Sequence, residues 1–180
     1  MRQQEFFNYL KSSKSFGGDL LKGANARQPR PLSTKNAVHV VMRSQLAKGP
    51  MSLRHHRHKK NVESIIRRQA EFWGMRLYKY ANVGNHLHLL LRPSSRRRFF
   101  GFLRSIAGLI ARAVLKAERG HAKGMRFWQA RPFTRIVRWG GDFVRAKEYV
   151  ELNAKEALGF LSPRRMKKLG LYNAELPDTA

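Results

Sequence analysis

The sequence has no cysteine and very few acidic residues. Without cysteine, the chain can form neither a disulfide framework nor a thiolate zinc site. Only 11 Asp and Glu stand against 37 Lys and Arg, which gives a formal net charge of +26. A compact chain with this charge repels itself unless a polyanion neutralises it, and nucleic acid is the usual polyanion because each phosphate contact releases condensed counterions. The charge therefore predicts a nucleic-acid partner.

Long apolar runs are also missing. No stretch of about 18 apolar residues occurs, so we expect no membrane span. The first ten residues are too polar for the hydrophobic region of a secretory leader, and we expect a cytoplasmic protein. With 42% hydrophobic side chains among 180 residues, the chain can nevertheless bury the core of one ordinary domain.

Breaker residues divide the chain into three predicted regions. Residues 1–36 are basic and rich in glycine, serine and proline, and we predict an N-terminal arm. Residues 37–160 carry regular apolar patterns and are predicted to fold. Residues 161–180 form a basic, then polar, C-terminal tail.

Within 37–160 the apolar period switches between two and 3.6 residues. We predict strands at 37–43, 75–80, 86–92 and 133–139, and helices at 61–73, 97–118 and 143–158. The order β-α-β-β-α-β with one further helix is that of an α+β, ferredoxin-like split βαβ fold. Its sheet is antiparallel, with the paired helices on one face.

His86-Leu87-His88 lies on a predicted strand. Because strand side chains alternate between faces, both imidazoles point to the same side of the sheet. Two imidazoles placed this way are able to ligate one divalent ion. The alternative is a pair of partly buried histidines without a metal.

The last predicted helix carries Tyr149 and Asn153, which share a helical face because they are four residues apart. Tyr149 could supply a phenolate nucleophile, and Asn153 an amide oxygen as a third metal ligand. The alternative is a tyrosine that only anchors the helix to the sheet, with its hydroxyl in water.

In their order along the chain, these motifs resemble a known family. The segment Gly84-Asn85-His86-Leu87-His88-Leu89-Leu90 looks like the HUH signature (His, hydrophobic, His) of single-strand transposases. The chain as a whole resembles the REP-associated tyrosine transposases of the insertion-sequence-200-like family over about residues 37–160. The other motifs that carry the resemblance are His39 and Arg43 on the early strand, Trp128-Gln129-Ala130-Arg131-Pro132-Phe133, and Tyr149 with Asn153.

Two positions depart from the family pattern. The family often has proline after the helical asparagine, where this chain has Ala154, and Met-Pro-Asn before the first histidine, where this chain has Val83-Gly84-Asn85. Neither change removes a reactive group, but both leave the subfamily and the DNA target open.

The resemblance implies a mechanism. Such enzymes cleave single-stranded DNA with one divalent metal ion, Mg²⁺ or Mn²⁺, and join the 5′-phosphate to a tyrosine. By this resemblance His86, His88 and Asn153 are metal ligands and Tyr149 is the nucleophile. The implied partner is single-stranded DNA, at hairpin-forming repeats, and the protein is a monomer or a helix-exchanged homodimer.

The basic segments are candidates for phosphate contact, against the alternative of a solvated charged face. The candidates are Arg54, Arg57, Lys59, Lys60, Arg96, Arg97, Arg98, Arg131 and Arg135. Aromatic residues close to them could stack on unpaired bases, namely Phe99, Phe100, Phe127 and Trp128. We assign the histidines of 55–58 to a basic loop, and His39 to packing near the site.

Two rival functions remain open. One is a catalytically inactive module on the same fold that binds hairpin DNA or RNA, and the other is a ribosome-associated basic protein. The first predicts no metal at His86 and His88 and no need for Tyr149, and the second explains the charge but not the histidine pair and the helical tyrosine. A Tyr149 hydroxyl that cannot come within several ångströms of the His86 and His88 nitrogens, even in a partner subunit, would count against catalysis.

Overall fold

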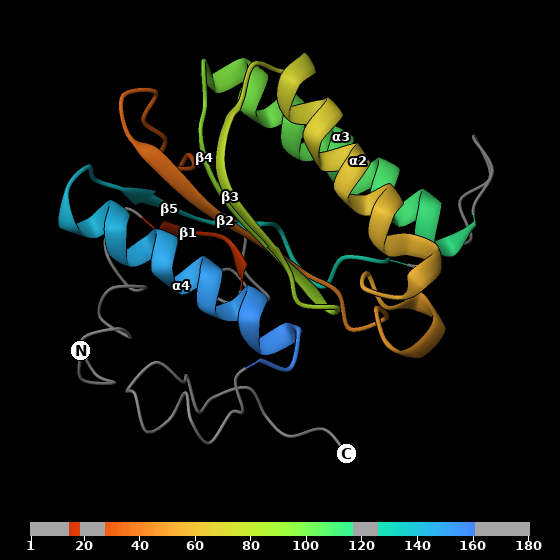
Figure 1. The fold of residues 1–180 in the computed structure, drawn as a ribbon. Coiled ribbons are helices and arrows are strands. Elements are labelled where there is room, and N and C mark those ends of the chain that lie inside the picture. The colour runs from red at the N-terminus through yellow and green to blue at the C-terminus, as the bar shows by residue number, and fades with distance from the viewer. Residues whose placement is uncertain (1–14, 19–27, 117–125, 161–180) are drawn as a thin grey trace.

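A five-stranded antiparallel sheet lies at the centre of the computed structural model, which describes residues 15–18, 28–116 and 126–160 (Figure 1). The strands run in the order β1-β5-β2-β4-β3 across the sheet. Their bounds are β1 Ser15–Phe16, β2 Ala37–Arg43, β3 Arg76–Asn82, β4 His86–Arg92 and β5 Phe133–Val137. The helices are α2 His56–Phe72, α3 Arg96–Leu115 and α4 Gly141–Ala157, with a short 3-10 turn, η2, at Gly49–Met51.

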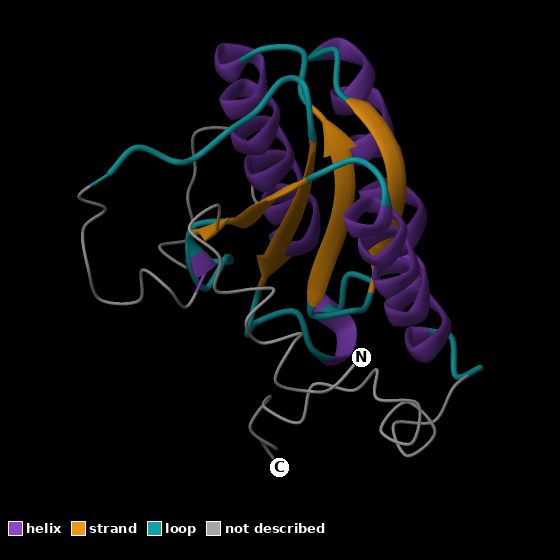
Figure 2. Cartoon of the chain, turned by 90° about the vertical axis from the view of Figure 1, so that its left-hand side faces the viewer, coloured by secondary structure: helices purple, strands orange, loops and turns teal. Residues whose placement is uncertain are grey.

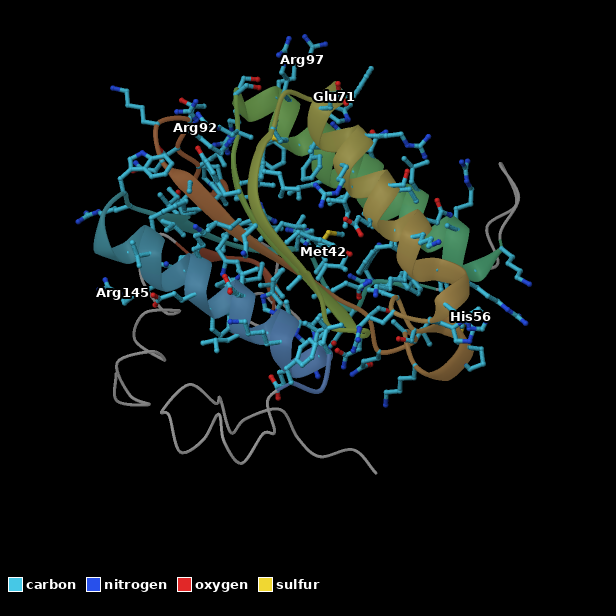
Figure 3. All side chains as sticks on the ribbon, viewed as in Figure 1. Met42, His56, Glu71, Arg92, Arg97 and Arg145 are labelled. Carbon is cyan, nitrogen blue, oxygen red and sulfur yellow. The ribbon has the colours of Figure 1, made fainter. Side chains whose placement is uncertain are left out.

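Helices cover both faces of the sheet (Figures 1 and 2). α2 and α3 lie together on one face, and α4 lies alone on the other. The larger core fills the α2–α3 side, where Met42 points from β2 towards the helices (Figure 3). A smaller core on the α4 side consists of Ala37, Ala81, Leu90, Val137, Ala146 and Val150.

The predicted ferredoxin-like fold is confirmed. Strands β5, β2, β4 and β3 are neighbours in that order, and every pair is antiparallel. The two helices of the split βαβ unit share one face, as that fold requires. The additional C-terminal helix packs on the opposite face, mainly against β3.

Alternation along β2 and β4 decides which side chains meet α4. Val38, Val40 and Leu89 face α2 and α3, so His39 and His88 must face the other way. Both imidazoles therefore lie beneath α4. This placement follows directly from the period-two pattern of the two strands.

The helix α2 begins at His56, five residues before the predicted start at Asn61, so the assignment of the histidines of 55–58 to a basic loop is wrong for His56 and His58. His58 occupies a buried position one turn before Val62, and its Nε2 lies 3.0 Å from the carbonyl oxygen of Pro50. The buried face of the first turn of α2 is thus occupied by a histidine. The pattern of apolar residues therefore did not extend to the true start of the helix.

Part of the predicted N-terminal arm is attached to the sheet. β1 pairs with β5 as an edge strand. Arg30 is buried, and its Nη1 donates to the carbonyl oxygen of Pro132 at 2.7 Å and to Oγ1 of Thr134 at 2.6 Å. Its guanidinium also lies 4.4 Å from the ring centre of Phe16. Arg30 therefore links the segment before β2 to β5.

Candidate active site

Three elements bring the predicted site residues together on the α4 side of the sheet. His39 comes from β2, His86 and His88 come from β4, and Tyr149 and Asn153 come from α4. The α4 helix is held over the strands by buried Val150 and by an ion pair across to β3, in which Lys79 Nζ lies 3.0 Å from a Glu151 carboxylate oxygen. The rigid strands and this docked helix set the geometry of the site.

The tyrosine ring lies beside the imidazoles. The Tyr149 ring centre is 5.5 Å from that of His88 and 5.8 Å from that of His39, and it meets both rings edge-on. The rings of His86 and His88 are 4.8 Å apart. The Tyr149 ring therefore lies next to one histidine of the HUH segment, His88.

His88 is buried and engaged on one ring nitrogen only. Its Nδ1 lies 3.1 Å from Nε2 of His39, whereas its Nε2 is buried without a hydrogen-bond partner among the described residues. A buried polar atom with no partner calls for a physical explanation. When Nδ1 carries the proton and donates a hydrogen bond to His39, Nε2 keeps an unprotonated lone pair, which is the form that binds a metal.

The same arrangement holds for His86. Its Nδ1 lies 2.5 Å from Oδ1 of Asn85. An amide oxygen accepts hydrogen bonds and cannot donate them, so this contact places the proton on Nδ1 and the lone pair on Nε2. Asn85 therefore sets the tautomer of His86, and His88 takes the same tautomer when it donates to His39.

Burial keeps these imidazoles neutral. It lowers the pKa of His39 to about 4, and together with the nearby charge of Arg43 it lowers the pKa of His86 to about 4. The pKa of His88 falls well below its ordinary value of 6.5, through burial first and then through the two neighbouring histidines. Neutral imidazole is the form that ligates metals, so no deprotonation is needed near neutral pH.

Asn153 and Tyr149 interact along one face of α4. The amide nitrogen of Asn153 donates to the backbone carbonyl oxygen of Tyr149 at 2.8 Å, which leaves the amide oxygen as an acceptor. Burial raises the pKa of the Tyr149 phenol, and a side-chain hydrogen bond with Asn153 partly offsets that rise. The Tyr149 phenol is therefore protonated near neutral pH when neither metal nor DNA is bound.

The site offers nitrogen and oxygen donors of types that divalent cations accept. Within the described parts of the chain, no group of three or more His, Asp or Glu side chains is arranged to hold a metal. A site here needs a ligand of another type, and Asn153 is the amide on the facing helix. Two imidazole nitrogens with one amide oxygen form a mixed nitrogen and oxygen set of the kind that divalent first-row metals accept.

Comparisons with known proteins now identify the family. The sequence profile described as "Transposase IS200 like" matches residues 33–153, which is well over half of the chain. This chain belongs to the IS200-like transposase family. A search among curated proteins gave no significant match.

One similar solved structure is a REP-associated tyrosine transposase bound to a REP hairpin. It shares 14% sequence identity with this IS200-like chain, with a TM-score of 0.59, over 86% of this chain and 93% of the other. At this identity the likeness concerns the fold. Every residue of the candidate site, from His39 to Asn153, lies within the range that matches the family.

The sequence places His39 near the site in a packing role, but it does not predict the contact of His39 with His88. His39 pairs across the sheet with Leu90, and Val41 pairs with His88, so the two histidines are diagonal neighbours on one face. The pairing register of β2 with β4 is the signal that brings them together, and single-strand patterns do not contain it.

Most of the predicted phosphate-binding residues of this IS200-like transposase lie on the surface. Exposed positions are Arg57, Lys59 and Lys60 on α2, Arg96, Arg97 and Arg98 on the first turn of α3, and Arg131 before β5. Arg54, just before α2, is half-buried. The Arg97 side chain points outward from α3 (Figure 3).

Arg135 differs from this group. Only 4% of it is exposed, and its Nη2 lies 2.9 Å from a carboxylate oxygen of Asp142 at the start of α4. Asp142 also accepts a hydrogen bond from the backbone nitrogen of Arg138 at 2.8 Å. Arg135 thus ties β5 to the first turn of α4.

The expected stacking role of the aromatic residues near these charges is largely wrong. Phe99 and Phe127 are buried in the larger core. Trp128 is partly buried, and its indole nitrogen donates to the carbonyl oxygen of Ala107 at 2.9 Å. Phe100 is half-buried with the Arg96 guanidinium 5.3 Å from its ring centre, so Phe100 and Trp128 are both partly available at the surface.

No helix in the described part of the chain has the length and apolar character needed to cross a membrane.

Proposed function

We propose that this protein is a metal-dependent single-strand DNA transposase that cleaves and rejoins DNA at hairpin-forming repeats through a 5′-phosphotyrosine intermediate. The observation that carries the proposal is the position of the Tyr149 ring, 5.5 Å from the ring of His88, whose buried Nε2 has no hydrogen-bond partner among the described residues. Membership of the IS200-like family and the hairpin bound by the structural neighbour support it.

The residues that would hold the metal are His86 and His88 through Nε2 and Asn153 through its amide oxygen. The metal would be Mg²⁺ or Mn²⁺. A bound divalent cation supplies Lewis-acid polarisation of a phosphate oxygen. The protein itself keeps both imidazoles neutral through burial and presents the three donors from rigid elements.

Tyr149 is the nucleophile in this proposal. Its phenolic oxygen forms a bond to the scissile phosphorus, and its proton passes to solvent. The bond from phosphorus to the 3′ oxygen of the neighbouring nucleotide breaks, and that oxygen takes up a proton to become a 3′-hydroxyl. Attack by a 3′-hydroxyl on the phosphotyrosine reverses the step and joins two strands.

His39 and Asn85 are positioning residues in the same proposal. Each contacts the Nδ1 atom of one ligand histidine, at 3.1 Å from His88 and 2.5 Å from His86. Partners of this kind orient a ligand ring and fix its tautomer. They do not touch the DNA or the reacting atoms.

The exposed cations on α2, α3 and the segment before β5 contact phosphates in this proposal. Together they supply the sequence-independent part of DNA binding. We leave Arg135 out of this surface because it is buried against Asp142, and we assign it a structural role.

The test is a cleavage assay on labelled single-stranded hairpin oligonucleotides with Mg²⁺ or Mn²⁺, resolved on a denaturing protein gel. We expect a covalent protein–DNA band for the wild type, and none for Tyr149→Phe, for His86→Ala or without metal. Tyr80→Phe is a matched control, because Tyr80 packs against the larger core on the other face of the sheet. Tight hairpin binding with no covalent band would instead support the catalytically inactive module.

A further inference from the structure

Three aromatic side chains gather where α4 begins, on the same face of the sheet as the candidate active site. Trp139 and Phe143 have ring centres 4.8 Å apart. Tyr78, on β3, meets both of them edge-on, at 5.7 Å from Trp139 and 5.2 Å from Phe143. We call these three residues the aromatic cluster.

Trp139 is held in place yet left open to solvent. Its indole nitrogen donates to the carbonyl oxygen of Lys35 at 2.8 Å, and Tyr78 and Phe143 pack against the ring. Even so, 45% of the residue remains exposed. A large aromatic ring that is fixed by its neighbours and still faces water is already arranged to receive a flat partner.

The surroundings of the aromatic cluster are positively charged. The Arg76 guanidinium lies 5.4 Å from the ring centre of Tyr78. Arg138 and Arg145 are exposed on either side of the first turn of α4, and Figure 3 shows Arg145 on the outer side of this helix. The carboxylate of this turn, Asp142, is engaged by Arg135. The partner that fits an aromatic surface among cations is an unpaired nucleotide, with a flat base and a charged phosphate.

The aromatic cluster lies at a useful distance from the nucleophile. Tyr149 follows Phe143 by six positions on α4, which corresponds to about 9 Å along the helix axis. At about 3.4 Å per stacked nucleotide, this spans about three nucleotides. A DNA strand whose scissile phosphate lies at Tyr149 is therefore able to reach the aromatic cluster with about three nucleotides.

We propose that Trp139, supported by Tyr78 and Phe143, is a stacking site for an unpaired base of the DNA strand that flanks the scissile phosphate. This inference rests on the proposed function and adds the path of the DNA strand next to the active site. The base is bound through its flat face, so the site tolerates different base identities, and the neighbouring arginines bind the phosphates.

The test measures binding of fluorescein-labelled single-stranded oligonucleotides by anisotropy, with Tyr149→Phe as the common background so that no cleavage occurs. We expect Trp139→Ala to weaken binding by about fivefold to 150-fold, the range that stacking of one base supplies. Trp139→Phe retains an aromatic face and should recover most of the affinity. Phe72→Ala is the matched control, because Phe72 is 74% exposed on α2, at the other face of the sheet, and should leave binding unchanged.

Two further measurements separate stacking from other causes. Replacing single nucleotides by abasic sites should find one position, about three nucleotides from the scissile phosphate, where Trp139→Ala has no additional effect because the stacked base is already missing. The dependence of affinity on salt should keep its slope in Trp139→Ala, because no phosphate contact is lost. Thermal melting of each variant checks that the fold is retained.

Some outcomes would overturn the inference. One is normal DNA binding by a folded Trp139→Ala variant. Another is that Trp139→Ala lowers the affinity by the same factor whichever nucleotide is made abasic. A Trp139→Ala variant that binds DNA normally but changes from dimer to monomer would show that the aromatic cluster contacts a second copy of this chain. If the wild type itself fails to bind single strands or to form the covalent band, then the proposed function fails, which is a different result from loss of the stacking site alone.

Discussion

His39 Nε2 lies 3.1 Å from His88 Nδ1, at the centre of a buried pair of nearly parallel rings. One proton between the two nitrogens determines the state of both rings. If His88 donates, its Nε2 is free for a metal and His39 must present a lone pair at Nε2. A residue with no contact to DNA in this proposal thus controls the form of a ligand.

The first prediction concerns this contact. Replacing His39 with alanine should weaken Mn²⁺ binding by about 10-fold to 100-fold, the usual effect of removing the partner of a ligand histidine. Mn²⁺ affinity can be measured by electron paramagnetic resonance of the free ion or by calorimetry, without DNA. His39→Gln should restore much of the affinity, because its amide oxygen accepts a hydrogen bond. Equal affinities in wild type and a folded His39→Ala protein would refute the positioning role.

The second prediction concerns the contact of α2 with α3. A Cβ added at Gly101 would overlap the ring of Trp73, which cannot move freely because its indole nitrogen donates to Ser105 Oγ at 3.1 Å. Gly101→Ala should therefore lower the free energy of unfolding by about 1–3 kcal/mol, the usual cost of overpacking. Urea denaturation followed by circular dichroism measures this change.

Gly108 supplies the matched control on the same helix. Nothing lies within 4 Å of a Cβ built there, so Gly108→Ala should raise the free energy of unfolding by about 0.5–1 kcal/mol through helix propensity. The two substitutions add the same methyl group to α3 with opposite expected signs. Destabilisation of similar size at both positions would count against the close packing of Trp73 on Gly101.

The third prediction concerns stability against pH. His39 has a pKa of about 4 in the folded protein and an ordinary value of 6.5. Between these values the unfolded chain binds a proton that the folded protein does not, so stability is full above about pH 6.5 and falls as the pH drops towards 4. The slope for one such histidine approaches about 1.4 kcal/mol per pH unit.

Urea denaturation of wild type and His39→Gln at pH 7.5, 6 and 5 tests this slope, without added metal. The substitution removes one titrating group and should make the dependence on pH shallower. A parallel dependence in both proteins would mean that folding does not lower the pKa of His39.

Much of the sheet was predictable from the sequence because its central strands alternate cleanly. The bounds of β2 and β4 agree with the predicted 37–43 and 86–92, since each strand presents apolar residues to the larger core at every second position. The alternation of side chains along β4 also predicted that His86 and His88 share one face. Strand bounds and side-chain faces depend on a single segment, so the local sequence pattern predicts them well.

What the sequence could not predict depends on contacts between segments. The two residues of β1 are too few to form a pattern, and the strand exists because β5 offers a free edge. The first turn of α2 was missed because His58, not an apolar residue, fills the buried position. The diagonal pairing of His39 with His88 requires the register of two strands that lie far apart in the chain.

The last prediction concerns the exposed cations at the start of α3. Because each phosphate contact with a single strand releases about 0.7 of a counterion, Arg97→Ala should reduce the slope of log affinity against log salt by about 0.7. Arg67→Ala is the control, since Arg67 is an exposed cation that already pairs with Glu63 at 2.8 Å on α2. Anisotropy titrations from 50 to about 200 mM salt measure both slopes. An unchanged slope in Arg97→Ala would place the strand elsewhere on the surface, whereas equal reductions in both variants would indicate a diffuse effect of net charge rather than a defined phosphate contact.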